Sequence, residues 1–354
     1  MKVTKLLLSI VLATGLSCLA MAQNQKSSSA KKDDEKKPLP LKLVQTIPLP
    51  GVEGRIDHMN VDVQGKRLFM AALGNQTVEV LDLAAGKRLQ SIAGLENPEG
   101  LVYVPQTNLL FVAAGAQGLN VYDGTSLKLL RSISPVAGND NVRYDPQSAA
   151  EFGAGVIFVS CDVGLRAFDS RDGKPLYEVP IATKAGRPES FQLEKMPGSR
   201  RIFANLPLQG EIAVVDASKK GALIAKWPVQ GFKQFFPMAL DEPDQRLFIG
   251  SRNPPALVVF DTTSGRIVTS VAGVTNTDDL FYDAARKRIY MSAAEGVVAV
   301  FEQRDPDHYQ LVAKVPTVPG ATTSFFAPEF NRLYVGVPPY AGQPTKVLVY
   351  EAQP

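Results

Sequence analysis

The stretch RLFMAALGNQTVEVLD, residues 67–82, holds two short apolar runs, and close counterparts of it recur along the chain. Its first run, RLFMAA, has an aromatic side chain at the third position and small residues at its end. Runs of this kind begin at residues 67, 109, 156, 201, 246, 288 and 332, at steps of 42 to 47 residues. Self-similarity at such a period is typical of a repeat architecture built from one supersecondary unit.

A second apolar run follows each first run and ends in an acidic residue. Short apolar runs rich in β-branched and aromatic residues predict buried strands. The terminal acids are Asp82, Asp123, Asp169, Asp216, Asp261, Glu302 and Glu351. Turn sequences such as AAGK, GTS and TTSGR follow several of them. Because an Asp in that setting starts a turn by bonding its own backbone, we predict turn residues here and not a set of ligands.

A third apolar run follows each of the first six turns, whereas the seventh unit stops at VLVYEAQP, residues 347–354. The segment LKLVQTIPLPG, residues 41–51, precedes the first unit and matches the missing run. Pairing it with the last unit would close a ring and leave no free sheet edge. The sequence therefore predicts an all-β fold, a seven-bladed β-propeller of four-stranded blades over residues 41–354, with the last blade closed by the N-terminal strand.

Two segments precede the predicted propeller. Residues 1–22 combine two lysines, an apolar stretch and an A-x-A site, which predicts a secretory signal peptide cleaved after Ala22. A retained N-terminal helix and a lipoprotein attached through Cys18 are the alternatives. Residues 23–40 are charged and polar, cannot bury enough apolar surface to fold, and predict a disordered linker. We expect a periplasmic or secreted protein without a transmembrane segment in the mature chain.

The charge and cysteine content exclude some classes of function. The net charge is +3, and loss of residues 1–22 with their two lysines lowers it to +1. So small a charge, without a basic patch, argues against nucleic-acid binding. Cys161 is then the single cysteine, so no intrachain disulfide can form. Its position at the end of the apolar run VIFVSC predicts a buried, unreactive thiol.

The segment that opens each unit is expected to be its innermost strand, with the preceding loop close to the channel axis. GRIDHMNVD, residues 54–62, contains one of the two histidines and aligns with the opening segments of the other six units. The position of Asp57 carries a carboxylate in five of the seven. The candidate ligand-binding residues at the channel entrance are Arg55, Asp57, His58, Asn97, Glu99, Asp140, Asn141, Arg187, Glu189, Asp278 and Asp279.

Carboxylates gathered in this way need compensation. Two of them about 6 Å apart repel by roughly 3 kcal/mol at an effective dielectric of 20. They must take up protons, recruit arginines such as Arg55, Arg187 and Arg143, or bind a cation. Three interpretations stay open: a solvated, self-neutralised ring, a ligand or substrate site, and a site for a divalent cation such as calcium. The candidate metal ligands are Glu99, Asp140, Asn141, Glu189 and Asp278.

Other notable residues favour structural roles. A lone histidine such as His58 is more often a hydrogen-bonded structural group than a catalytic base. His308 lies in the turn of the sixth blade and is expected to be exposed. Trp227 lies on an outer strand and is expected to pack between blades. The arginines that begin the RLF and RIF runs are expected to brace a neighbouring blade.

The repeats resemble those of a known family. LFVAAGAQGLNVYD, residues 110–123, and RLFIGSRNPPALVVFD, residues 246–261, resemble the YVTN repeat, a strand ending in small residues followed by a V-x-V-x-D strand. Residues 41–354 are thus similar to the YncE-like, YVTN-repeat β-propellers of secreted bacterial proteins. The literal YVTN tetrapeptide is replaced here by sequences such as LFVAAG and LYVGVP. The resemblance implies the propeller fold and secretion, but this family is functionally broad and transfers no catalytic residue.

Two main classes of function follow. The first is a non-enzymatic binding or scaffold module that presents the face around its channel to a protein, polymer or small ligand. The chain has no G-x-S-x-G, H-E-x-x-H, C-x-x-C-H or P-loop motif. The second is a metal-dependent hydrolase similar to propeller lactonases, in which an axial divalent cation activates water and a carboxylate or His58 acts as base. An accessory subunit of a periplasmic dehydrogenase is a third class, without a cofactor motif. We expect a monomer.

Overall fold

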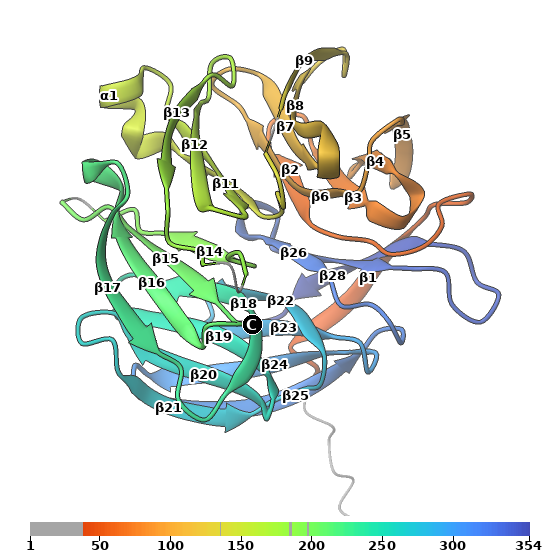
Figure 1. Cartoon of the computed structure of the whole chain (residues 1–354). Coiled ribbons are helices and arrows are strands. Elements are labelled where there is room, and N and C mark those ends of the chain that lie inside the picture. Colours follow the sequence, from red (N-terminus) through yellow and green to blue (C-terminus); the bar gives the residue numbers. More distant parts are fainter. Residues whose placement is uncertain (1–37, 135, 184–185, 197) are drawn as a thin grey trace, which may run out of the picture. The chain divides into compact units, whose positions relative to one another are not determined.

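The computed structural model describes residues 38–134, 136–183, 186–196 and 198–354. Within these residues, seven four-stranded antiparallel sheets form the blades of a propeller (Figure 1). The predicted seven-bladed β-propeller is confirmed. The predicted signal peptide, and the part of the predicted linker that precedes residue 38, lie outside the described residues. No helix among the described residues is long and apolar enough to cross a membrane.

The strands of each blade follow one another from the channel to the rim. The innermost strands are β2 (Met59–Asp62), β6 (Pro98–Val104), β10 (Val142–Asp145), β14 (Phe191–Leu193), β18 (Lys233–Asp241), β22 (Thr277–Asp283) and β26 (Ser324–Ala327). The second strands are β3 (Arg67–Ala72), β7 (Leu109–Ala114), β11 (Val156–Cys161), β15 (Arg201–Leu206), β19 (Arg246–Asn253), β23 (Arg288–Ala293) and β27 (Arg332–Val337).

The third and outermost strands complete each sheet. The third strands are β4 (Thr77–Asp82), β8 (Gly118–Asp123), β12 (Gly164–Asp169), β16 (Glu211–Asp216), β20 (Pro255–Asp261), β24 (Val297–Asp305) and β28 (Lys346–Ala352). The outermost strands are β5 (Lys87–Ile92), β9 (Leu129–Ile133), β13 (Pro175–Val179), β17 (Ala222–Pro228), β21 (Ile267–Ala272), β25 (His308–Pro316) and β1 (Leu41–Pro48). A short helix, α1 (Ala149–Phe152), lies in the loop between β10 and β11.

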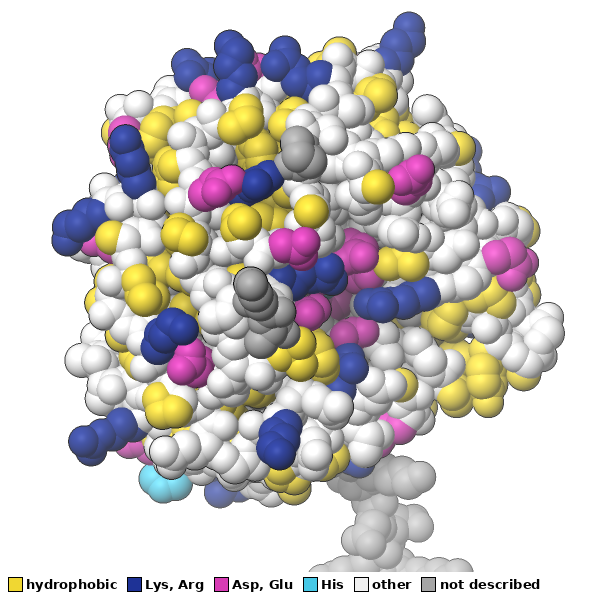
Figure 2. All heavy atoms as spheres, in the orientation of Figure 1, with side chains coloured by type: hydrophobic (Ala, Val, Ile, Leu, Met, Phe, Trp, Pro, Cys, Tyr) yellow, Lys and Arg dark blue, Asp and Glu magenta, His cyan; other side chains and the backbone are white. Residues whose placement is uncertain are grey.

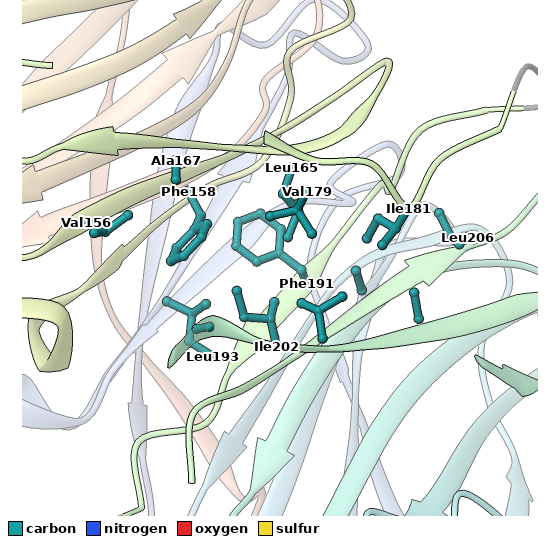
Figure 3. Close-up of a cluster of buried hydrophobic side chains, with 14 residues drawn as sticks. Val156, Phe158, Leu165, Ala167, Val179, Ile181, Phe191, Leu193, Ile202 and Leu206 are labelled. Atoms are coloured by element: carbon teal, nitrogen blue, oxygen red, sulfur yellow. The ribbon is translucent and has the colours of Figure 1, made fainter. Parts of the chain in front are cut away.

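The second strands are apolar along almost their whole length because neighbouring blades cover both of their faces. The aromatic residues at their third positions are buried, and the side chains of Phe69, Phe111, Phe158, Phe203, Phe248 and Tyr290 are 0% exposed. Figure 3 shows one interface between blades, where Phe158 and Val179 face Phe191 and Ile202 of the next blade. The repeated aromatic residue therefore marks the packing between blades.

Arginines that begin second strands brace the next blade, as predicted. Arg67 Nη1 donates to the carbonyl of Gly124 at 2.7 Å, and Arg246 Nε donates to the carbonyl of Pro306 at 2.8 Å. Each acceptor belongs to a turn of the neighbouring blade. The guanidinium of Arg67 also lies over the ring of Phe69 at 5.3 Å. The arginine thus links the apolar interface to the turn beyond it.

Further structural predictions are also confirmed. Asp82 Oδ1 accepts hydrogen bonds from the backbone N–H groups of Ala84 and Ala85, both at 2.8 Å, as a turn residue does. Trp227 is 8% exposed and lies between the rings of Phe203 and Phe260. His308 is exposed as predicted, with 74% of its side chain accessible. Cys161 is buried as predicted, and it forms no disulfide within the described residues.

The ring closes by the predicted pairing of β1 with β28. Their antiparallel register runs from Leu41 opposite Ala352 to Pro48 opposite Lys346. One residue before this strand, the carbonyl of Pro40 accepts a hydrogen bond from the N–H of Gln353 at 2.9 Å. The first strand of the propeller therefore lies in one sheet with its last three, and the ends of the ring are held together by backbone hydrogen bonds.

A pair of alanine substitutions in β1 tests how this closure stabilises the fold. Ile47→Ala removes a side chain that is 0% exposed, and we expect a loss of about 2–5 kcal/mol in the free energy of unfolding. Leu43→Ala on the same strand removes a side chain that is 49% exposed, and we expect a change within about 0.5 kcal/mol. Urea denaturation measures both values, and equal losses would contradict the role assigned to Ile47.

Candidate functional site

The backbone pairing of the blades continues into the loops that lead to the innermost strands. The N–H of Asp57 donates to the carbonyl of Ala71 at 2.8 Å, and the N–H of Ala71 donates to the carbonyl of His58 at 3.0 Å. The N–H of Asp140 donates to the carbonyl of Ser160 in the same way, at 3.1 Å. Equivalent candidate residues of different blades are therefore held at equivalent heights around the axis.

We call the charged groups that meet at the channel entrance the charged ring. It comprises six carboxylates and five cationic groups: Asp57, Glu99, Asp140, Glu189, Asp278 and Asp279, with Arg55, Arg143, Arg187, Arg252 and His58. Acidic and basic side chains gather near the centre of the face that Figure 2 shows. The two signs nearly balance, so the carboxylates are largely compensated by the chain's own cations.

One side of the charged ring is built around Asp278. Arg252 Nη2 lies 2.5 Å from Asp278 Oδ1, and Arg252 Nε donates to the carbonyl of Thr277 at 2.8 Å. The guanidinium of Arg252 also lies over the ring of Phe236, 4.2 Å from its centroid. On the other side of Asp278, Arg55 Nη2 lies 3.8 Å from its Oδ2. The same nitrogen is 3.1 Å from Asp57, and the Arg55 side chain is 59% exposed.

The opposite side is built around Arg187. Its Nη2 lies 3.2 Å from Asp140, 3.4 Å from Glu99 and 3.9 Å from Glu189. One cation thus serves three carboxylates that come from three blades. A single guanidinium cannot neutralise three charges, so this side of the ring favours the uptake of further positive charge.

His58 lies between three carboxylates. Its Nε2 is 3.6 Å from Asp140 and 3.7 Å from Asp57, and its Nδ1 is 3.6 Å from Asp279. Burial alone would lower the pKa of His58, but hydrogen bonds with Asp140 and Asp279 and the charge of Asp57 raise this pKa well above its ordinary value. The imidazole is therefore held as an imidazolium, in which neither nitrogen has a lone pair to act as a base.

Asn141 completes the surroundings of His58. Its amide lies 3.0 Å from His58 Nε2. Because Nε2 carries a proton in the imidazolium, the amide must turn its oxygen toward the ring. The same rotation gives a partner to Asn141 Oδ1, which is otherwise buried without a hydrogen bond among the described residues. Asn141 thus helps to fix the orientation of the protonated ring.

The carboxylates of the ring differ in their affinity for protons. Burial, with the charge of Asp140, raises the pKa of Glu99 to about 8. Burial also raises the pKa of Asp57 to about 7, although His58 and Arg55 oppose the shift. The pKa of Glu189 is raised by burial and by Asp140. Burial acts the same way on Asp140, but His58 and Arg187 outweigh it and lower that pKa.

The channel has three compartments. The mouth pocket, about 440 Å³, lies above the charged ring and is lined by Arg55, Glu189, Phe236, Arg252, Asn276 and Asp278 among others. The inner cavity, about 60 Å³, lies within the ring and reaches His58, Arg143 and Asp279. The lower channel, about 390 Å³, extends beyond His58 and Arg143 along the innermost strands. The inner cavity has room for a few waters only, whereas each wider compartment has room for part of a larger ligand.

The structure brings most of the candidate residues together. Arg55, Asp57, His58, Glu99, Asp140, Asn141, Arg187, Glu189, Asp278 and Asp279 contact one another directly or through a shared partner. Asn97 instead lies exposed in the loop before β6 and lines neither the mouth pocket nor the inner cavity. Arg252 also belongs to the ring but was not predicted from the sequence. Among the seven second strands, RLFIGS alone is followed directly by an arginine, and this was the available signal.

The predicted site for a divalent cation depends on whether the carboxylates of the charged ring are free to bind it. Within the described ranges, no group of three or more His, Cys, Asp or Glu side chains is arranged to hold a metal ion. Three of the proposed ligands, Glu99, Asp140 and Asp278, have an arginine nitrogen within 3.4 Å. A cation would have to displace these arginines, and the calcium site stays a prediction.

Comparisons with known proteins support the fold. No protein-family model matches the sequence, and no curated protein is similar to it. Among solved structures, the chain is similar to one from the crystal structure of a mitotic checkpoint complex, with a TM-score of 0.72 and 13% sequence identity. The match covers 96% of this chain and 100% of the other. At this identity the similarity shows the β-propeller fold alone.

The protonation state of His58 can be tested by NMR. We expect both ring nitrogens of His58 to carry protons at pH 7.5, because its carboxylate neighbours raise its pKa. A long-range ¹H–¹⁵N spectrum of a His308→Gln variant, in which His58 is the remaining histidine, reports this directly. Adding Asp140→Asn removes one neighbouring charge and should lower the pKa. A neutral imidazole at pH 7.5 in the His308→Gln variant would contradict the assignment.

Proposed function

We propose that this protein is a non-enzymatic binding propeller that takes a positively charged group of a partner into the mouth pocket. The observation that carries this proposal is the excess of carboxylate around Arg187, where Glu99 and Glu189 have raised pKa values. A carboxyl group that holds a proton near neutral pH can release that proton and form an ion pair with the cation of a ligand. The ion pair then compensates the negative charge in place of the proton. Of these groups, Glu189 lines the mouth pocket, which is open to solvent.

The geometry favours an ammonium or guanidinium group from a lysine or arginine of a protein partner. Glu189 and Asp278 both line the mouth pocket. Asp278 is already paired with Arg252 at 2.5 Å, whereas Arg187 approaches Glu189 only to 3.9 Å, so an entering cation meets Glu189 as the less compensated carboxylate. Phe236 lies in the same pocket and offers an aromatic surface to the carbon chain that bears the charge. The exposed Arg55 guanidinium at the rim favours a partner that also presents an acidic or carbonyl group next to its cation.

The protonated His58 supports binding over hydrolysis. A general base needs a free lone pair near the reacting atom. Both nitrogens of His58 face carboxylates at 3.6 Å or slightly more, and the raised pKa keeps them protonated. The residue thus stabilises the ring by its charge. We therefore favour the binding module over the lactonase-like hydrolase.

The finer family and location are part of the same proposal. We propose that the chain is a YncE-like, YVTN-repeat propeller, on the strength of the repeats at residues 110–123 and 246–261. The signal-like sequence of residues 1–22 supports a periplasmic or secreted location. An exported propeller with a charged mouth is suited to recruiting a partner outside the cytoplasm.

Binding of a model cation tests this function. We expect the full chain to bind fluorescein-labelled hexalysine at low salt, and to bind hexaglutamate much more weakly. Glu99→Gln and Glu189→Gln should each weaken hexalysine binding by roughly tenfold, the loss of one charge-assisted contact. The matched control is Glu211→Gln, since Glu211 forms an ion pair with Lys226 away from the channel at 2.9 Å. Equal affinity in all variants, measured by fluorescence anisotropy, would refute the proposal.

The pH dependence of the same binding gives a second test. Glu99 and Asp57, whose pKa values are about 8 and 7, ionise as the pH rises through this range. Hexalysine should therefore bind more tightly at pH 8.5 than at pH 6, and isothermal calorimetry in buffers of different ionisation enthalpy should detect proton release. Affinity that stays constant with pH would contradict the role of these carboxylates. Saturable Ca²⁺ binding that Asp278→Asn abolishes would instead favour the metal-dependent alternative.

A further inference from the structure

The lower channel differs in character from the mouth pocket. Its walls come from the innermost strands and mix polar side chains such as Gln192 with apolar ones such as Val102 and Leu280. The rings of Phe281 and Phe325 meet edge to face in the same wall, with centroids 5.7 Å apart. A compartment of about 390 Å³ with an aromatic pair in its wall is of the size that binds small organic molecules.

One charged group, Arg143, stands at the upper end of this compartment. Arg143 lines both the inner cavity and the lower channel, so it stands at the junction of the two. Its Nη1 donates to the carbonyl of Val142 at 3.1 Å, and its guanidinium lies over the ring of Phe191 at 5.8 Å. Among the described residues it makes no other hydrogen bond and no ion pair, so most of its five N–H donors stay available.

The nearest carboxylates do not satisfy Arg143 because they have other partners. Asp279 Oδ2 accepts a hydrogen bond from the N–H of Ser324 at 2.8 Å, and its Oδ1 faces His58. Asp140 is bound by His58 and Arg187. Burial lowers the pKa of Arg143, although both carboxylates act on it from a distance. A partly buried guanidinium without an ion pair is costly, and an anion beside it would remove that cost.

We propose that the lower channel is a second binding site, which takes a small organic carboxylate with an apolar body. The carboxylate pairs with Arg143, and the apolar body lies against Phe281, Phe325 and the aliphatic side chains of the innermost strands. Lys195 is exposed at the rim of this compartment and attracts anions toward it. The site is separate from the proposed mouth function, because its cation and its walls belong to another compartment.

Calorimetry with octanoate tests this site on the full chain. Octanoate is the probe, and octanamide has the same apolar body without the charge. We expect one octanoate per chain, and an affinity roughly tenfold to a hundredfold lower in Arg143→Met. Arg131→Met is the matched control, because Arg131 is exposed on β9 far along the sheet from the channel, and it should leave the affinity unchanged. Octanamide should bind wild type and Arg143→Met equally.

A second variant keeps the proposal testable if Arg143→Met does not fold. Leu240→Trp fills the lower channel without removing a charge, and it should abolish octanoate binding while hexalysine binding at the mouth persists. Three results would each overturn the proposal: no octanoate binding to wild type at millimolar concentration, unchanged affinity in a folded Arg143→Met, or full affinity in Leu240→Trp.

Discussion

The pairing of β1 with β28 is the constraint on which the rest of this structure depends. Each blade buries its second strand only when a neighbour covers it, so an open row of blades would leave an apolar face and a free sheet edge. The antiparallel register from Leu41 to Pro48 removes that edge and joins the two ends of the repeat. Closure also sets the axis, and every loop that leads to an innermost strand then points toward it.

Convergence on one axis explains the electrostatics of the channel. A single acidic loop residue per blade is unremarkable in a row of repeats, but a closed ring gathers such residues within a few ångströms. Arg187 therefore meets carboxylates from three blades. His58 also lies near three carboxylates, one of which, Asp140, it shares with Arg187. Burial and mutual repulsion then raise the proton affinity of Asp57 and Glu99.

The same ring divides the channel into regions of different chemistry. Above it, Glu189 is the weakly compensated carboxylate that the proposed cation would meet in the mouth pocket. Below it, the guanidinium of Arg143 and the aromatic pair of Phe281 and Phe325 make the lower channel suited to an apolar anion. The ring lies between the two proposed sites, and Arg143 lines both the inner cavity within the ring and the lower channel beyond it. One fold thus offers two sites of opposite charge preference.

The sequence by itself determined the blade number, the buried aromatic positions and the closing strand, because these depend on a period and on apolar patterns within short segments. It also identified the carboxylates of the entrance, since alignment of the repeats places five of them in one column and Asp279 in the next. Only the tertiary structure decided which cations compensate them. Arg252 comes from a second strand, and Arg143 lines the lower channel as well as the inner cavity. Such pairings join residues from different blades, and no local pattern specifies them.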